Sequence, residues 1–128
     1  MDTRRHFTGS PWEPVVGYCR ALRAGDHVFV SGTAPVAEGG GVFAPGDAYR
    51  QMQRCCQIVL AALANLGARP EHVVRTRMFV TDISRWKDIG RAHAEAFGKS
   101  PPVTSMVEVK SLIDPAMMIE LEAEALVR

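Results

Sequence analysis

Apolar residues recur at spacings of three and four in two stretches of the chain, which is the pattern of an amphipathic helix. The first stretch follows Asp47, a residue type that caps helix N-termini, and it ends before Gly67. The second follows Ser84 and ends before Gly98. The apolar positions are Met52, Cys55, Cys56, Val59, Leu63 and Leu66 in the first stretch, and Trp86, Ile89, Ala92, His93, Ala96 and Phe97 in the second. We therefore predict two helices, with Trp86 in the core.

Other segments alternate between side-chain types with the period of two that is typical of strands. Residues 15–31 predict a hairpin whose turn is Ala24-Gly25-Asp26. Residues 73–81, 103–109 and 117–127 predict three further strands. The resulting order is hairpin, helix, strand, helix, strand, strand. It predicts an α+β fold with a single mixed sheet and both helices on one face.

The face of the sheet that the helices leave free is expected to be partly apolar. Period two places Val16, Tyr18 and Arg20 on one face of the first predicted strand. We expect Met106 and Glu120 to lie on the same side of the sheet. Such a surface is too apolar for water, so the sequence predicts that other subunits cover it.

The length of 128 residues suits one domain over 1–128 without a linker. No apolar run approaches the roughly 18 residues that a membrane span needs, and the first residues lack a secretory signal, so a cytoplasmic protein without membrane contacts is expected. Arg4 and Arg5 are interpreted as solvated terminal charges. Three cysteines, with Cys55 and Cys56 adjacent, predict buried reduced thiols and no metal site.

A net charge of +1 excludes a global field that would attract nucleic acid or anionic lipid. The glycines at 39–41 predict a flexible loop, because the lysine and hydroxyl residue of a phosphate-binding loop do not follow them. Ser31 has no histidine and carboxylate at recognisable spacing, which favours a hydrogen-bonding role over a nucleophilic one. His93 is expected to be a packed histidine, with proton transfer as the alternative.

Five segments in order, with matching spacers, resemble the Rid family of reactive intermediate deaminases, also called YjgF or endoribonuclease L-PSP-like proteins. They are Val16-Gly17-Tyr18, Val28-Phe29-Val30-Ser31-Gly32, residues 73–82, Val107-Glu108-Val109 and Ile119-Glu120-Leu121-Glu122-Ala123. The resemblance implies a chorismate-mutase-like fold and a homotrimer with a barrel core and pockets between subunits. It also implies hydrolysis of enamines and imines, such as 2-aminoacrylate, to a keto acid and ammonia without a cofactor or metal.

The same resemblance assigns a role to several residues of this chain. Tyr18 and Ser31 with Gly32 match pocket-lining positions, and Glu120 matches the glutamate that orients the attacking water. From the residues alone, Glu120 could equally belong to a solvated strand face, and Tyr18 could be an ordinary interface aromatic.

Three positions depart from the family pattern, one of them Gly90, which aligns with an asparagine that is frequent in the family's second helix. Thr104 stands where the family's deaminases carry an arginine that holds the substrate carboxylate, and Met106 replaces a frequent cysteine. Each charge-assisted hydrogen bond contributes about 1.5 to 3 kcal/mol, which a threonine hydroxyl does not replace. The substrate therefore lacks the carboxylate, or another cation serves it, or the site binds without turnover. Arg20 is the best substitute, with Arg75 and Arg77 as alternatives.

Three functions follow from these observations. The first is a Rid-like hydrolase acting on a small imine or enamine that is not the usual 2-aminoacrylate. The second is a non-catalytic trimer that binds a small metabolite. The third and weakest is an RNA-directed role, for which the clustered basic residues are Arg20 with Arg23 and Arg75 with Arg77.

Overall fold

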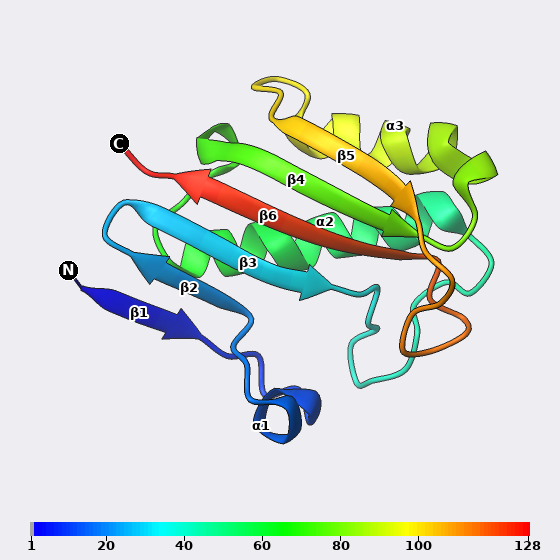
Figure 1. Ribbon diagram of the computed structural model, residues 1–128, viewed down its shortest axis with the longest axis horizontal. Coiled ribbons are helices and arrows are strands. Elements are labelled where there is room, and N and C mark those ends of the chain that lie inside the picture. Colours follow the sequence, from blue (N-terminus) through cyan, green and yellow to red (C-terminus); the bar gives the residue numbers. More distant parts are fainter. Residues whose placement is uncertain (1) are drawn as a thin grey trace.

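The computed structural model describes residues 2–128, which form one six-stranded sheet with two long helices against it (Figure 1). The strands are β1 (Thr3–His6), β2 (Ala21–Ala24), β3 (His27–Thr33), β4 (Val73–Val80), β5 (Val103–Glu108) and β6 (Ile119–Leu126). The α-helices are α1 (Trp12–Val16), α2 (Ala48–Asn65) and α3 (Trp86–Phe97), and the 3-10 turns are η1 (Pro70–His72) and η2 (Ile83–Arg85).

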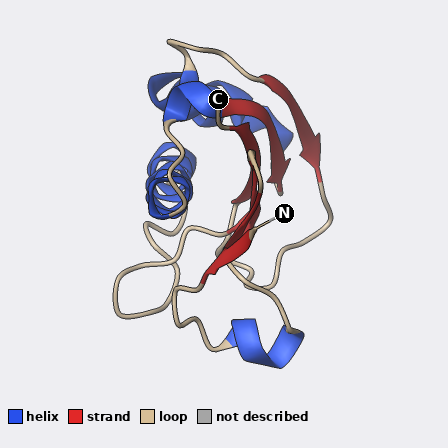
Figure 2. Ribbon diagram, turned by 90° about the vertical axis from the view of Figure 1, so that its left-hand side faces the viewer, coloured by secondary structure: helices blue, strands red, loops and turns tan. Residues whose placement is uncertain are grey.

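The sheet has the strand order β1-β2-β3-β6-β4-β5. Every neighbouring pair is antiparallel except β4 and β5, which are parallel and are connected through α3. Helices α2 and α3 lie on the same side of the sheet, and the other side is uncovered (Figure 2). The prediction of an α+β fold with one mixed sheet and two helices on one face is therefore confirmed.

The strongest sequence patterns correspond to the elements of the core. Asp47 caps α2 by accepting a 3.0 Å hydrogen bond from the Arg50 backbone N–H, as predicted. Strand β6 alternates between buried apolar residues, which pack against the helices, and the three glutamates on the opposite face. Cys55 and Cys56 are free thiols on the buried face of α2, and burial raises the pKa of Cys56 to about 12. The two thiols are therefore part of the core.

The N-terminal region differs from the prediction. The hairpin has the expected turn, but its first strand begins at Ala21, because residues 12–16 form α1. Gly17 ends that helix with φ 86°, a left-handed conformation that glycine adopts without strain, and it reverses the chain before Tyr18. Arg4 and Arg5, interpreted as solvated terminal charges, are exposed, but they belong to β1 and pair with β2.

Two predictions about side-chain placement are also wrong. Trp86 is 53% exposed, because η2 precedes α3 and places the tryptophan at the first, outward-facing position of the helix. Ser84 does not cap α3 as predicted. It lies in η2, which Asp82 caps by accepting bonds from the Ser84 backbone N–H at 3.0 Å and the Ser84 hydroxyl at 2.6 Å. Met106 lies beside Met78 and packs against the helix-covered core, not on the free face.

Candidate functional site

A cavity of about 860 Å³ lies at the end of β3 and the start of β6. Its walls come from the segment around α1, from the loop that contains the glycines at 39–41, and from α2. Five of the predicted site residues line it: Tyr18, Arg20, Ser31, Gly32 and Glu120. They come from three separate segments of the chain, so the fold brings the positions indicated by the resemblance together with Arg20, the proposed substitute cation.

Arg20 is a buried cation at the wall of this cavity, with only 8% of its surface exposed. Its Nη1 donates to the Gly32 carbonyl at 2.7 Å and to Thr33 Oγ1 at 2.9 Å. The guanidinium also lies 5.4 Å from the centre of the Tyr18 ring, within range of a cation–π contact. Tyr18 and Arg20 are therefore neighbours as predicted, although the strand proposed to hold Tyr18 does not form.

Glu120 lies against the backbone of Gly32. A Cβ atom at position 32 would be 2.9 Å from the Glu120 carboxyl carbon and 3.1 Å from each carboxyl oxygen, too close for an undisturbed contact. Glycine at position 32 therefore leaves the space that the carboxyl group occupies. This close approach places Ser31-Gly32 and Glu120 side by side in the cavity wall.

The environment of Glu120 alters its acidity. Burial raises the pKa of its carboxyl group, the Arg20 guanidinium opposes the rise, and the nearby Glu122 carboxylate adds to it. The net direction is upward. A carboxylate with a raised pKa is a stronger base than an ordinary surface glutamate, so Glu120 is suited to accept a proton from water.

Ser31 takes part in the wall of the cavity through its hydroxyl oxygen. The hydroxyl donates a 2.7 Å hydrogen bond to the Cys19 carbonyl, which uses its only hydrogen. The lone pairs of the oxygen remain available as acceptors. This geometry fits a hydrogen-bonding wall better than a nucleophile.

Glu13 is a buried residue that the sequence pattern did not indicate. Its carboxylate accepts bonds from the backbone N–H groups of Thr8 and Gly9, both at 3.2 Å, and from the Thr8 hydroxyl at 2.8 Å. Burial alone would raise the pKa of Glu13, but these bonds and the nearby Arg20 lower it overall. An ionised Glu13 thus fixes the segment that lines the cavity next to Tyr18.

Helix α2 holds the remaining walls through two polar side chains that the sequence pattern also missed. The Gln51 amide is fully buried, donating to the Ala116 carbonyl at 2.9 Å and accepting from the Met118 N–H at 2.8 Å. Arg54 Nε donates to the Val36 carbonyl at 2.7 Å. Together they attach both neighbouring loops to α2.

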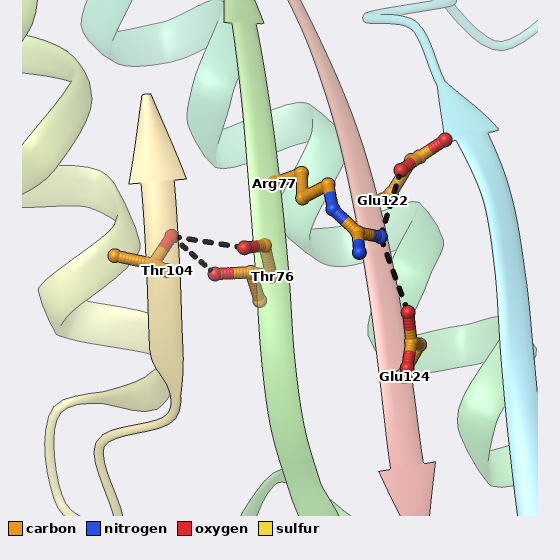
Figure 3. A network of polar contacts seen from close by, with 5 residues as sticks. All are labelled: Thr76, Arg77, Thr104, Glu122 and Glu124. Carbon is orange, nitrogen blue, oxygen red and sulfur yellow. Dashed lines mark hydrogen bonds and ion pairs between the residues drawn. The ribbon is translucent and has the colours of Figure 1, made fainter. Parts of the chain in front are cut away.

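Thr104 and Met106 do not reach this cavity within one chain. They lie on β5, the edge strand two strands away from β6, and their side chains point to the helix-covered side. Thr104 forms hydrogen bonds with Thr76 on β4 (Figure 3). The structure therefore separates the predicted site residues into two groups, one at the cavity and one at the β5 edge.

The other arginines proposed as substitutes lie on the uncovered face of the sheet. Arg77 Nη1 is 3.1 Å from a Glu124 oxygen and 3.5 Å from a Glu122 oxygen, so two carboxylates balance its charge (Figure 3). Arg75 is exposed and precedes it on β4. Neither lines the cavity around Glu120, whereas Arg20 does.

Two further properties of residues 2–128 bear on the chemistry. Within this part of the chain, no cluster of three or more histidine, cysteine, aspartate or glutamate side chains is placed to hold a metal ion. None of the helices in the same residues is both long and apolar enough to span a membrane.

Comparison with known proteins gives consistent matches over nearly the whole chain. The family model described as Endoribonuclease L-PSP matches residues 8–127. Protein SCO2049 of Streptomyces coelicolor is 37% identical over 122 residues, which cover 95% of this chain and 90% of that protein. The 3-aminoacrylate deaminase RutC of Acinetobacter baylyi is 30% identical over 117 residues, which cover 91% of each chain.

Solved structures agree with these sequence matches. Rv2704 of Mycobacterium tuberculosis, a member of the YjgF/YER057c/UK114 family, superposes with a TM-score of 0.89 at 44% identity, covering 98% of this chain and all of its own. The YjgF gene product of E. coli superposes with a TM-score of 0.79 at 28% identity, covering 87% and 88%.

The sheet order and the carboxylate-lined cavity thus define a YjgF-type α+β protein. The chain belongs to the endoribonuclease L-PSP family, also called the YjgF, RutC or Rid family.

Proposed function

We propose that the protein is a cofactor-independent hydrolase of small imines or enamines, with Glu120 as the residue that activates water. The observation that carries the proposal is the Glu120 carboxyl group, which has a raised pKa and lies in a cavity between Gly32 and Arg20. The deaminase name of the RutC relative supports the same class of reaction.

The reaction needs one water molecule and one group that moves protons. Solvent protonates the imine nitrogen, and water adds to the carbon of the resulting iminium ion while the Glu120 carboxylate accepts one proton of the water, which gives a carbinolamine. Glu120 then returns that proton to the amine, and the carbon–nitrogen bond breaks as the carboxylate takes the hydroxyl proton, which leaves a carbonyl group and ammonia. The ammonia takes up this proton and leaves as ammonium, so the Glu120 carboxylate is regenerated. An enamine enters the same sequence after protonation at carbon converts it to the imine.

Arg20 has a supporting role in this scheme. Its charge lowers the pKa of Glu120 and so keeps part of the carboxylate ionised against the effect of burial. The charges of Arg20 and Glu120 already offset each other. A substrate carboxylate placed here would therefore be repelled by the Glu120 carboxylate as well as attracted by the Arg20 guanidinium. We therefore infer that Arg20 does not replace the missing arginine clamp, and that the preferred substrate is not 2-aminoacrylate.

The complete pocket requires a second copy of the chain. Thr104 is exposed on the free edge of β5, far from Glu120 and on the other side of the sheet. Large apolar side chains are exposed near the cavity mouth and on the uncovered sheet face, namely Val15, Val16 and Phe29. A homotrimer with a barrel core would bury them and set Thr104 and Met106 of one subunit opposite Glu120 of the next.

The pairing of Arg77 with Glu122 and Glu124 argues against an RNA-directed role, because it removes a free basic charge from the uncovered face. A non-catalytic binding trimer is the remaining alternative. The same experiment separates it from the hydrolase.

Ammonia release is the direct test. Imines with and without a carboxylate would be generated in situ by an amine or amino-acid oxidase, and their hydrolysis would be followed with wild-type, Glu120→Gln and Glu124→Gln proteins. We expect wild type and Glu124→Gln to accelerate hydrolysis, and Glu120→Gln to fail. Absence of acceleration by wild type with every imine, combined with saturable binding of carbonyl products, would establish the binding protein instead.

A further inference from the structure

Three side chains from different elements form a continuous hydrogen-bonded chain at the β5 edge. His93 Nε2 on α3 lies 2.7 Å from Thr76 Oγ1 on β4, and Thr76 Oγ1 lies 2.7 Å from Thr104 Oγ1 on β5. Figure 3 shows the part that joins the two threonines. The chain runs from the partly buried interior to the exposed residue that takes the place of the family's arginine.

The central residue of this chain is unusual for its place. Thr76 is 1% exposed and points into a core formed by apolar neighbours such as Met78 and Val80 on the same strand. A buried hydroxyl carries a desolvation cost unless it is hydrogen-bonded, and valine has nearly the same shape without that cost. The hydroxyl of Thr76 is therefore explained by its hydrogen bonds, and its two side-chain partners are His93 and Thr104.

The Thr76 hydroxyl, as donor to Thr104, sets the direction of the other hydrogen bonds. Thr76 has one hydroxyl hydrogen, which it donates to Thr104. The contact with His93 is then a bond that His93 Nε2–H donates to Thr76 Oγ1. Thr104 in turn donates to the Thr76 carbonyl at 3.2 Å, its longest bond. That hydrogen is available to a better-placed acceptor outside the chain.

We propose that His93, acting through Thr76, orients the Thr104 hydroxyl as a donor toward an uncharged oxygen of the ligand. The ligand class would be small carbonyl or imine compounds that carry an amide, ester or ketone where the usual substrates carry a carboxylate. This inference rests on the proposed function, since Thr104 meets the ligand only in the assembled pocket. His93 is a positioning residue, because it acts through another side chain.

The hydrogen-bonded chain of His93, Thr76 and Thr104, called the relay below, is uncharged, which agrees with this ligand class. Burial lowers the pKa of His93, so the imidazole is neutral at neutral pH. The ring also packs against Phe97 with 5.0 Å between ring centres, which holds its orientation. A neutral donor complements a carbonyl oxygen, whereas a carboxylate would enter without the charged partner that stabilises it.

A matched pair of product analogues tests the inference by equilibrium binding to the full-length protein. Pyruvate and pyruvamide differ only in the carboxylate and the amide. We expect wild type to bind pyruvamide about tenfold more tightly, because the lost charge-assisted bonds penalise only pyruvate. Equal or tighter binding of pyruvate would overturn the ligand class.

Variants of the relay test the role of His93 and Thr76. Thr104→Val, Thr76→Val and His93→Leu should each weaken pyruvamide binding about three- to tenfold and leave pyruvate unchanged, since each removes or misdirects one neutral hydrogen bond. Thr76→Ser and His93→Gln should restore part of the affinity. Weaker pyruvamide binding in Thr104→Val, combined with unchanged binding in Thr76→Val, would overturn the relay. An equal loss for both ligands in Thr76→Val would do the same.

Turnover distinguishes this inference from the proposed function. If wild type hydrolyses imines in a Glu120-dependent manner but Thr76→Val keeps full affinity for pyruvamide, the hydrolase stands and the relay does not. If wild type hydrolyses no imine but prefers pyruvamide in a Thr76-dependent manner, the relay stands and the hydrolase does not. In active protein, KM for neutral imines should rise in Thr76→Val while kcat changes little.

Discussion

The cavity around Glu120 and the β5 edge around Thr104 differ in how their polar groups are held. At the cavity, the side chains of Arg20 and Glu13 are buried and charged, and backbone groups satisfy them. At the β5 edge the polar groups are neutral hydroxyls and an imidazole, with one end exposed. In our proposal the charged group at the cavity provides proton transfer, whereas the neutral group at the β5 edge distinguishes between ligands.

The largest effect on activity is expected when Glu120, the proposed general base, is replaced. Replacement of Glu120 by glutamine keeps the shape but removes the proton acceptor, so kcat should fall about 10²- to 10⁴-fold. Steady-state ammonia release measures it. Glu124→Gln is the matched control, because Glu124 lies on the same strand face but contacts Arg77 and does not line the cavity. Comparable losses in both variants would contradict the assignment of Glu120.

The next largest effect concerns the space beside the carboxyl group. In Gly32→Ala the new methyl group would lie 2.9 Å from the Glu120 carboxyl carbon, so the side chain must move and kcat should fall about 10²-fold. Gly90→Ala is the control, since a Cβ there meets nothing within 4 Å. That change should stabilise α3 by about 0.5 to 1 kcal/mol without loss of activity. Full activity in Gly32→Ala would contradict the importance of the close contact between position 32 and the Glu120 carboxyl group.

A smaller effect on activity is expected when Arg20, the buried cation beside Glu120, is replaced. Arg20→Gln removes the charge that lowers the pKa of Glu120, so that pKa should rise further and the acid limb of the kcat/KM profile should move to higher pH. Activity near neutral pH should drop several-fold. Arg23→Gln serves as control, because Arg23 also bonds two backbone carbonyls but does not line the cavity. If the acid limb of Arg20→Gln lies at the same pH as that of wild type, the charge of Arg20 does not affect the pKa of Glu120.

The smallest effect is on stability. Because the folded-state pKa of Glu120 is raised, its favourable contribution is complete below the unfolded-state pKa and is lost as pH rises through the folded-state value. Glu120→Gln stays neutral throughout. Its Tm should therefore match that of wild type near pH 4 and exceed it by about 1 to 3 °C at pH 8. Thermal unfolding across this range checks the sign, and a variant less stable at pH 8 would contradict it.

The sequence predicted those parts of the molecule in which one periodic pattern determines the packing. Helix α2 with its Asp47 cap, β4, and β6 with Glu120 all follow from burial on one face. The start of the first predicted strand, at Val15 and Val16, was misassigned because valine has strand propensity. These residues instead end a short helix, which has Pro11 at its N-cap and Gly17 at its C-cap. Trp86 was misplaced because η2 changes where the helical stripe begins.

The candidate site was predictable to the extent that its residues stand in recognisable segments. Tyr18, Ser31, Gly32 and Glu120, which the resemblance indicated, line one cavity together with Arg20, which was proposed from its place beside Tyr18. Glu13 and Gln51 were missed, because their importance comes from bonds to backbone groups that are distant in the chain or in an irregular loop. The relay from His93 to Thr104 depends on the parallel register of β4 and β5, which no local pattern reveals.

The contact between Gly32 and Glu120 also constrains how this site can change during evolution. A larger residue at position 32 and a glutamate at position 120 cannot occupy the same space, since the added Cβ would overlap the carboxyl group. The two positions should therefore covary: an alanine at 32 is compatible with the shorter aspartate at 120. The double substitution Gly32→Ala with Glu120→Asp should accordingly be more active than Gly32→Ala alone.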